Sequence, residues 1–253
     1  MAQKTIYMIS GNKGGVGKSL FCLALASAFD MRGEHYAIFD GDGRTGDVFA
    51  AFSQKIPARW GDFRMLRPES HNCDLDGEYE MTLHKLLRGS PNLIVNTPDG
   101  ADSILAKWFD VTLAHTESNN YQFKLIYLLS DRPDGLDMID ELAKRFQFMY
   151  PVRNMYFGGE QLFAAFNTGY AKKFNAVIEF PRLRGEEVRM LFDLKTYPFE
   201  ILNLKRRPEN TFTAPAIARA RILKWQKLVY DNIVDMIENT DVSNFSLRGS
   251  NGS

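Results

Sequence analysis

A glycine-rich turn near the amino terminus contains the residues best suited to chemistry. Residues 11–19 read Gly-Asn-Lys-Gly-Gly-Val-Gly-Lys-Ser, after the apolar run 6–9 and before the apolar run 20–26. A strand, a glycine-rich turn and a helix in that order make a phosphate-binding loop, because backbone N–H groups and the positive end of the helix face the same point. Lys18 adds a full positive charge, and Ser19 is placed to ligate the Mg²⁺ that accompanies a triphosphate. The loop therefore predicts nucleotide binding.

The elements that must position this loop alternate along the chain. Strands are expected at 4–10, 35–40, 92–96, 121–129, 152–157 and 175–180, and helices at 18–31, 80–88, 102–115, 135–148, 160–173, 184–193 and 215–238. Strands separated by helices predict an α/β fold with a mainly parallel, twisted sheet and helices on both faces. Such a sheet binds its ligand at the carboxyl ends of its strands, where the loop lies. We expect one domain over residues 1–238, with an irregular stretch at 41–79 that is a candidate insertion or partner surface, and a flexible polar tail at 239–253.

The composition is that of an ordinary globular protein, and it argues against a disulfide-rich protein and against a membrane-spanning one. Of the 253 residues, 45% are hydrophobic and 25% are charged, and the net charge is zero. Two cysteines do not make a disulfide framework, which fits a reducing cytoplasm. No signal peptide is expected, and no apolar run approaches the roughly 18–20 residues that span a bilayer, so membrane insertion is not expected. The stretch 182–230 contains eleven Lys/Arg against five Asp/Glu, which favours a polyanionic partner.

The glycine-rich loop departs from the ordinary P-loop pattern at its start. Asn12 stands where that pattern has its first glycine, and a second lysine, Lys13, heads the variant K-G-G-x-G-K-[ST]. With this deviant Walker A sequence the chain resembles the ParA/MinD family of dimerising ATPases, which have a P-loop NTPase fold. The resemblance implies that Lys13 reaches the partner's nucleotide across a dimer and that Lys13 and Lys18 serve catalysis. It also implies nucleotide contacts from Lys13, Gly14, Gly15, Val16, Gly17, Lys18, Ser19 and Leu20.

Two carboxylates follow the expected strand 35–40. Asp40 and Asp42 lie two residues apart at its carboxyl end, where they can approach Mg²⁺ and a water near the γ-phosphate. They match the family's switch I D-x-D segment, so the resemblance assigns Asp42 to orienting the attacking water and Asp40 to the magnesium shell with Ser19. A turn that uses Asp and Gly only for their backbone tolerance is the other interpretation of this segment.

The segment 92–100 resembles the family's Walker B and switch II pattern. Its apolar strand ends in N-T-P-D-G, where the family has D-x-P-x-G. Asn96 therefore replaces the first acid. Its amide can hold a metal-bound water but adds no negative charge, which predicts weakened metal affinity or hydrolysis. Asp99, three residues later, is a candidate to compensate.

Two further surfaces are indicated in the last third of the chain. By the family resemblance, Phe180 and Pro181 form an apolar wall for adenine, and backbone groups through Arg182 and the next residue read its edge. A plain strand-to-helix turn is the alternative. Several relatives bind DNA non-specifically through basic residues near the carboxyl terminus, which here are Arg206, Arg207, Arg219, Arg221 and Lys224. A solvated helix face is the alternative for these.

The function that the resemblance implies is an ATP-dependent dimerising switch ATPase. Mg-ATP joins two subunits in a sandwich dimer that binds DNA non-specifically, and slow hydrolysis, stimulated by an adaptor protein, resets it. The task is partition, stability or positioning of plasmid DNA in a bacterial cytoplasm, in association with the nucleoid. Two alternatives stay open: an ATP-sensing binding module that hydrolyses little because of Asn96, and a P-loop small-molecule ligase with a pocket built from 41–79.

Overall fold

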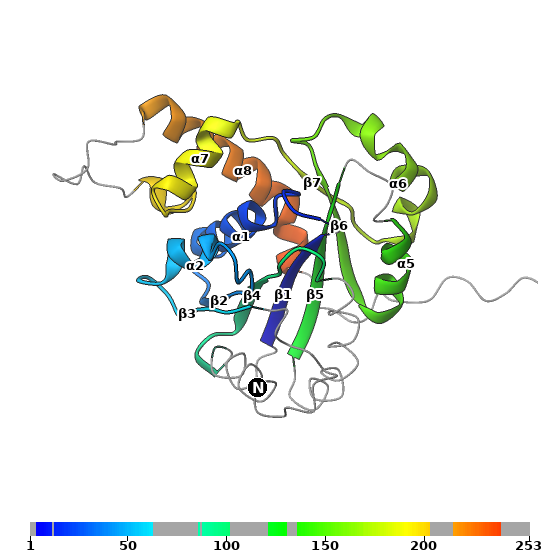
Figure 1. Ribbon diagram of the computed structural model, residues 1–253, viewed down its shortest axis with the longest axis horizontal. Helices are drawn as coiled ribbons and strands as arrows, with labels where there is room; N and C mark the ends of the chain where they lie inside the picture. Colours follow the sequence, from blue (N-terminus) through cyan, green and yellow to red (C-terminus); the bar gives the residue numbers. More distant parts are fainter. Residues whose placement is uncertain are drawn as a thin grey trace, which may run out of the picture.

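The computed structural model is organised around one parallel β-sheet (Figure 1). It describes residues 4–11, 13–62, 86, 88–101, 121–130, 136–202 and 215–238. Within these residues seven strands pair in the order β3-β2-β4-β1-β5-β6-β7, and every pairing is parallel. The strands are β1 (Lys4–Gly11), β2 (Tyr36–Asp40), β3 (Ala58–Trp60), β4 (Asn92–Asn96), β5 (Tyr121–Leu129), β6 (Phe148–Asn154) and β7 (Ile178–Phe180). The predicted α/β fold with a parallel sheet is confirmed.

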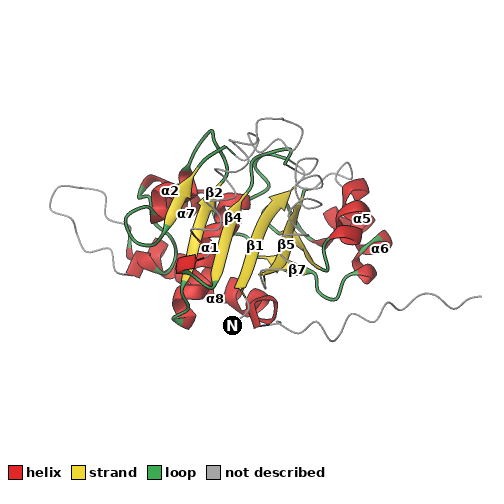
Figure 2. Ribbon diagram, turned by 90° about the horizontal axis from the view of Figure 1, so that it is seen from below, coloured by secondary structure: helices red, strands yellow, loops and turns green. Residues whose placement is uncertain are grey.

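Helices cover both faces of this sheet, as predicted (Figure 2). The described helices are α1 (Lys18–Arg32), α2 (Asp47–Phe52), α5 (Leu136–Arg145), α6 (Ala164–Gly169), α7 (Gly185–Asp193) and α8 (Ala216–Glu238), with 3₁₀ turns η3 (Glu160–Phe163), η4 (Ala171–Lys173) and η5 (Glu200–Leu202). Alternate side chains of β1 enter two cores: Tyr7 and Ile9 meet α1, α2, α7 and α8, whereas Ile6 and Met8 meet α5 and α6. The sheet is therefore the middle of three layers.

α1 is the most deeply buried helix of the helix layer that contains α8. Every residue from Phe21 to Phe29 is buried between the sheet and the neighbouring helices. This burial explains why the stretch is apolar almost throughout rather than on one stripe, and each large side chain in it contributes about 1.5–3 kcal/mol. Nε2 of Gln226 on α8 donates to the carbonyl of Ala24 (3.0 Å), which fixes how α8 lies along α1. Because α1 begins directly after the glycine-rich loop, this packing also fixes the loop.

Element boundaries differ from the prediction in the second half of the chain. β6 covers 148–154, with Pro151 inside it, whereas a strand was predicted at 152–157. β7 pairs only with residues 152–154, so Pro151 has no neighbour on that side to which an N–H group would donate. The predicted helix 160–173 is three short pieces, and the predicted strand 175–180 is reduced to β7.

The stretch 41–79 was predicted as loop with one or two short elements. Its described part contains two, α2 and β3, and β3 adds an edge strand beside β2. Residues 63–79 lie outside the described residues, as do most of the predicted helix 80–88, the predicted helix 102–115 and the predicted tail 239–253. None of the helices in the described ranges has the length and apolar character that crossing a membrane requires.

Candidate nucleotide-binding site

The glycine-rich loop joins the end of β1 to the first turn of α1, as predicted. β1 ends at Gly11 and α1 begins at Lys18. Gly15 and Gly17 have φ angles of 75° and 101°, which residues with side chains adopt only at a cost. The carbonyl of Gly17 accepts from the amide of Phe21 (2.9 Å), so the helix starts at once after the turn. The loop thus lies at the carboxyl edge of the sheet and at the positive end of a helix.

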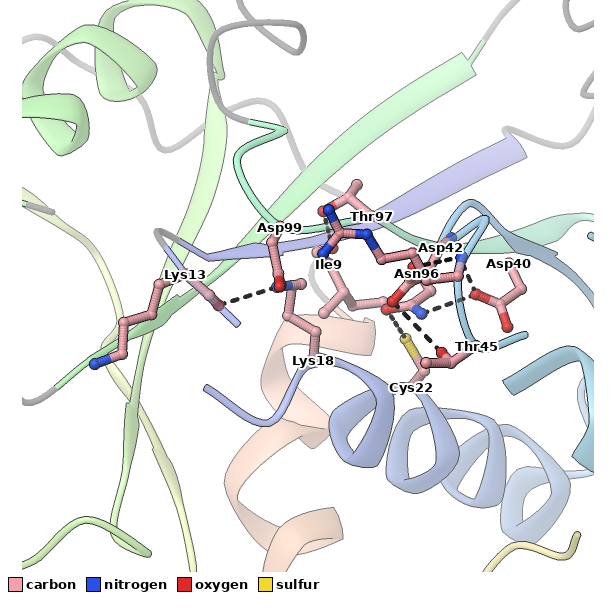
Figure 3. Close-up of polar contacts among 11 residues, drawn as sticks. Ile9, Lys13, Lys18, Cys22, Asp40, Asp42, Thr45, Asn96, Thr97 and Asp99 are labelled. Atoms are coloured by element: carbon pink, nitrogen blue, oxygen red, sulfur yellow. Dashed lines mark hydrogen bonds and ion pairs between the residues drawn. The ribbon is translucent and has the colours of Figure 1, made fainter. Parts of the chain in front are cut away.

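The ammonium group of Lys18 is buried under this loop. The side chain is 7% exposed, and its Nζ donates to the carbonyl of Lys13 (3.1 Å) and to Oδ1 of Asp99 (2.7 Å). The other oxygen of Asp99 lies against Gly14, where a Cβ would come within 2.4 Å of it. Figure 3 shows this ion pair, with the side chain of Lys13 pointing away from Lys18. A carboxylate from the loop after β4 therefore neutralises the loop lysine.

Three buried side chains form a hydrogen-bonded chain beside the loop (Figure 3). Asp40 ends β2 and Asn96 ends β4, and the two are register partners in the sheet. Nδ2 of Asn96 donates to Oδ1 of Asp40 (2.9 Å), and the thiol of Cys22 donates to Oδ1 of Asn96 (3.6 Å). Burial raises the pKa of Asp40 above its ordinary value, and hydrogen bonds from the amide of Phe49 and from Asn96 oppose this. An acid at position 96 would place two carboxyl groups in contact.

The loop after β2 is fastened to the edge strand β3. The carboxylate of Asp42 accepts from the amide of Arg44 (3.0 Å), so it is turned into its own loop rather than toward Lys18. Nε1 of Trp60, at the end of β3, donates to the carbonyl of Asp42 (2.8 Å), and its ring stacks on Phe49 with centroids 6.5 Å apart. Trp60 also packs on Gly46, where a Cβ would come within 2.9 Å of the ring. The sequence did not assign Trp60 to the site.

The residues predicted to hold magnesium fit a hydrated ion. Both oxygens of Asp40 already accept hydrogen bonds, Oδ1 from Asn96 and Oδ2 from the amide of Phe49 (2.9 Å). Over the described ranges no three His, Cys, Asp or Glu side chains form a group that could hold a metal. In nucleotide sites Mg²⁺ keeps several waters and binds phosphates with only one or two protein oxygens. Asp40 can therefore meet such an ion only through a bound water, and Ser19, directly after Lys18 at the start of α1, stays the predicted hydroxyl ligand.

The end of β6 supplies a residue that the sequence did not single out. Nδ2 of Asn154 donates to the carbonyl of Val16 (2.8 Å), and Oδ1 accepts from the amide of Tyr156 (3.0 Å). Asn154 also lies against Gly17, where a Cβ would come within 2.6 Å of Nδ2. The available signal was its place at the carboxyl end of a parallel strand. The predicted strand 152–157 ran past that end and concealed it.

Phe180 does not form the apolar wall that the sequence predicted. It is 1% exposed and packs on Trp225 with ring centroids 5.4 Å apart, because β7 turns it toward the core beneath α8. The carbonyl of Pro181 accepts from Nε1 of the same tryptophan (2.7 Å), so it also faces inward. The exposed group here is a pair: the guanidinium of Arg182 lies 5.7 Å from the ring centroid of Tyr156. Both side chains of this pair are exposed, whereas Phe180 is buried.

The residues predicted to bind DNA lie in different environments. Arg221 pairs with Glu187 (3.1 Å), whose side chain is 1% exposed, while Arg219 is partly buried and Lys224 is exposed. Further along α8, Lys227 pairs with Asp231, one turn later (3.2 Å). Part of the positive charge of α8 is therefore neutralised within the protein. The predicted Arg206 and Arg207 lie outside the described residues.

The comparisons with known proteins agree with the geometry of the loop. No protein-family model matches the chain. The septum site-determining protein MinD of Pyrococcus horikoshii OT3, complexed with Mg-ADP, is similar in structure with a TM-score of 0.56 and 12% identity, over 94% of this chain and 98% of that one. A putative plasmid partition protein of Borrelia burgdorferi B31, bound to AMPPNP, has a TM-score of 0.52 and 13% identity, over 88% of this chain and 98% of that one.

These similarities, with the loop sequence, define the class: the chain has the fold of the ParA/MinD-type P-loop ATPases. A curated sequence is also similar to this chain. Protein MobD of Acidithiobacillus ferrooxidans is 26% identical over 171 residues, which cover 65% of this chain and 69% of that protein. The fold to which the loop sequence pointed is thus the fold that these solved structures share with this chain.

Proposed function

We propose that this chain is an ATP-dependent dimerising switch that binds Mg-ATP at the loop 11–19. The observation that carries the proposal is the position of Lys18, a buried ammonium group at the first turn of a helix and at the carboxyl edge of a parallel sheet. Such a position favours an anionic phosphate over any neutral ligand. The Mg-ADP complex of the similar MinD and the AMPPNP complex of the similar partition protein support a nucleotide as that anion.

Each part of the site has a role in this proposal. Amide groups of the loop and the ammonium of Lys18 bind the phosphates, and Asn154 holds the loop in shape through the carbonyl of Val16. Tyr156 and Arg182 contact the base. Magnesium, when bound beside Ser19 and Asp40, neutralises charge on the phosphates.

The second lysine of the loop is the basis for dimerisation. The side chain of Lys13 points away from Lys18 of its own subunit, which suits a contact with phosphates bound to a second subunit (Figure 3). A nucleotide that binds the dimer more tightly than the monomer shifts the equilibrium toward the dimer. Hydrolysis then returns the protein to the monomer.

Hydrolysis in this proposal is slow, because the carboxylate of Asp42 must leave the amide of Arg44 before it can orient a water. An adaptor protein that rearranges this loop would stimulate the reaction. The bond between Asn96 and Asp40 favours a second candidate, an ATP-sensing module with little hydrolysis, since the amide adds no negative charge beside the metal.

We further propose that the ATP-bound dimer binds DNA non-specifically and partitions or positions plasmid DNA on the bacterial nucleoid. The exposed Lys224 and the partly buried Arg219 on α8 support this, and so does the similarity to a putative plasmid partition protein. Binding through phosphates predicts a steep dependence on salt and little dependence on base sequence. A mobility shift with ATP, with ADP and without nucleotide, over a salt series, tests it. Equal binding in all three states would contradict a switch.

The mass of the full chain in solution tests the switch directly. Light scattering after size exclusion is expected to give a dimer with Mg-ATP and a monomer with Mg-ADP or no nucleotide. Lys13→Ala should stay monomeric with ATP while still binding it. Lys144→Ala, which removes an exposed lysine of α5, is the matched control and should dimerise. One mass in all three nucleotide states would rule out the switch, and phosphate release equal to that of Lys18→Ala would favour the sensing module.

A further inference from the structure

Asp99 supplies a negative charge that the first turn of α1 lacks. Lys18 adds a cation to the positive end of this helix, and the first turn has no acidic residue to offset it. The compensating charge comes from 81 residues further along the chain, through the 2.7 Å contact between Nζ of Lys18 and Oδ1 of Asp99. The second oxygen of Asp99 rests on the backbone at Gly14, which only a glycine permits. A carboxylate thus lies at the mouth of the phosphate-binding loop.

The backbone is anchored close to this carboxylate. Two residues earlier, the amide and the hydroxyl of Thr97 both donate to the carbonyl of Ile9 (3.1 and 2.9 Å), which fixes the start of the loop after β4 to the end of β1. Beyond that anchor Asp99 is 48% exposed, and Gly100 has a φ angle of 68°. The carboxylate is therefore delivered to Lys18 by a fixed anchor but is free to swing into solvent.

We infer that Asp99 is an internal competitor of the nucleotide for Lys18. This inference rests on the proposed function for the identity of the ligand. A phosphate that binds the loop needs the ammonium group that Asp99 now occupies, and it brings negative charge next to a carboxylate. Binding must therefore displace Asp99 and move the loop after β4. The side chain lowers the affinity of the site for phosphate and reports phosphate occupancy to the residues that follow it.

The competing explanation is that Asp99 replaces the acid missing at position 96 and supports magnesium. The structure favours competition, because the carboxylate is directed at Lys18 and not at the pair formed by Asp40 and Asn96 (Figure 3). The two roles predict opposite effects of neutralising Asp99. Loss of a competitor tightens nucleotide binding with or without metal, whereas loss of a metal partner weakens binding only when Mg²⁺ is present.

Titration calorimetry of ADP and ATP against the full chain, in EDTA and in Mg²⁺, separates these roles. Asp99→Asn is expected to bind both nucleotides roughly 3- to 10-fold more tightly than the parent, in EDTA as well as in Mg²⁺, as suits the loss of one partly exposed ion pair. Asp99→Ala should do the same, which guards against a special effect of the amide. The matched control is Asp140→Asn on α5, which removes an ion pair with Lys173 of the same 2.7 Å length, far along the chain from the loop. Its carboxylate is nearly as exposed as that of Asp99, whereas Lys173 is half exposed and Lys18 is buried.

The outcomes separate this inference from the proposed function. Equal affinity in the parent, Asp99→Asn and Asp99→Ala overturns the competitor while leaving nucleotide binding in place. Weaker binding confined to Mg²⁺ overturns it in favour of the metal role. If neither the parent nor the Asp99 variants bind ADP or ATP, the proposed function falls and the inference falls with it. Tighter binding in both Asp99 variants, with Asp140→Asn unchanged, supports it.

Discussion

Lys18 and Lys124 are both buried lysines, but their ammonium groups lie at opposite ends of helices. Lys18 is the first residue of α1 and pairs with the half-exposed Asp99. Lys124 is fully buried in β5, and its Nζ donates to the carbonyls of Met236 (2.6 Å) and Ile237 (3.4 Å) in the last turn of α8. Both ammonium groups are withdrawn from water, yet their partners differ in kind.

The helix ends explain the difference. Carbonyl groups at the carboxyl end of a helix carry partial negative charge and stabilise a cation, whereas the amino end carries partial positive charge and repels it. The partners of Lys124 are backbone atoms of a packed helix and cannot leave, and the ring of Tyr7 lies 5.4 Å away on another side. The partner of Lys18 is a side chain that a ligand can replace. A buried lysine indicates a binding site when its partner is replaceable, and burial alone does not indicate one.

The largest effect expected from this comparison is on ligand binding by Lys18. Lys18→Ala should weaken ADP and ATP binding by at least about 100-fold, because the full positive charge that Lys18 places under the loop is lost. It should change the free energy of unfolding by less than about 1 kcal/mol, since the carboxylate of Asp99 that loses its partner is half exposed. Calorimetry and urea unfolding measure the two effects. Retained nucleotide affinity would place the binding site elsewhere.

For Lys124 the expectation is reversed. Lys124→Ala should lower the free energy of unfolding by about 2–3 kcal/mol, because it leaves a cavity in the core and two helix carbonyls without their donor. Nucleotide affinity should stay within about twofold of the parent, since these contacts lie at the other end of the helix layer. Lys124→Met, which keeps most of the volume, should recover part of the loss. If Lys124→Ala weakened nucleotide binding as much as Lys18→Ala, the distinction between a ligand-binding and a structural buried lysine would be wrong.

The pH dependence of stability should also single out Lys124. Burial lowers the pKa of Lys124 to about 8, and the negative charge of Glu34 opposes this. The unfolded chain holds the proton up to a pKa of about 10.4. Between these values the unfolded state binds more protons than the folded one, so folding stability rises with pH, by roughly 1–3 kcal/mol in total.

Urea unfolding of the parent and of Lys124→Met from pH 7 to 10 measures this rise. Buried tyrosines with raised pKa values that do not contact Lys124, such as Tyr36, contribute equally to both proteins. The difference between the two curves therefore reports Lys124 together with Tyr7, whose ring lies 5.4 Å from its Nζ. A difference that does not change with pH would show that Lys124 keeps its ordinary pKa.

The fold could be predicted from the sequence where one hydrophobic pattern extended over enough residues. The apolar strand, glycines and apolar helix around residues 4–32 predicted β1, the loop and α1 almost to the residue. α2 and β3 cover only 47–52 and 58–60, too short to show a period. β6 begins before the strand predicted at 152–157 and includes Pro151, which is tolerated there because the neighbouring strand β7 pairs only with residues 152–154.

The sequence predicted the contiguous part of the site, and it named Asp99 as a compensating acid but not as the partner of Lys18. Lys18 and Ser19 follow from a contiguous motif, and Asp40 from its place after a strand. Asp99, Asn154 and Trp60 reach the site through contacts with residues 81, 138 and 18 positions away, respectively. Such contacts depend on the order of strands in the sheet, which a sequence pattern does not specify. The burial of Phe180 was missed for the same reason, since α8 supplies the ring that covers it.

The smallest predicted effect tests whether the region of Lys18 depends on a preformed loop as well as on charge. Asn154→Ala removes the donor to the carbonyl of Val16, so the loop must be ordered by the ligand, and ADP affinity should fall roughly 3- to 10-fold. The matched control is Asn232→Ala, which removes a similar amide-to-carbonyl bond (2.7 Å, to Glu179) on the outer side of α8.

Calorimetry at two salt concentrations separates the effect of loop shape from the effect of charge. The loss from Asn154→Ala should be independent of salt, whereas the gain from Asp99→Asn should shrink as salt screens the pair. A salt-dependent loss would mean that Asn154 acts through charge at Lys18, and that the loop itself is rigid without it.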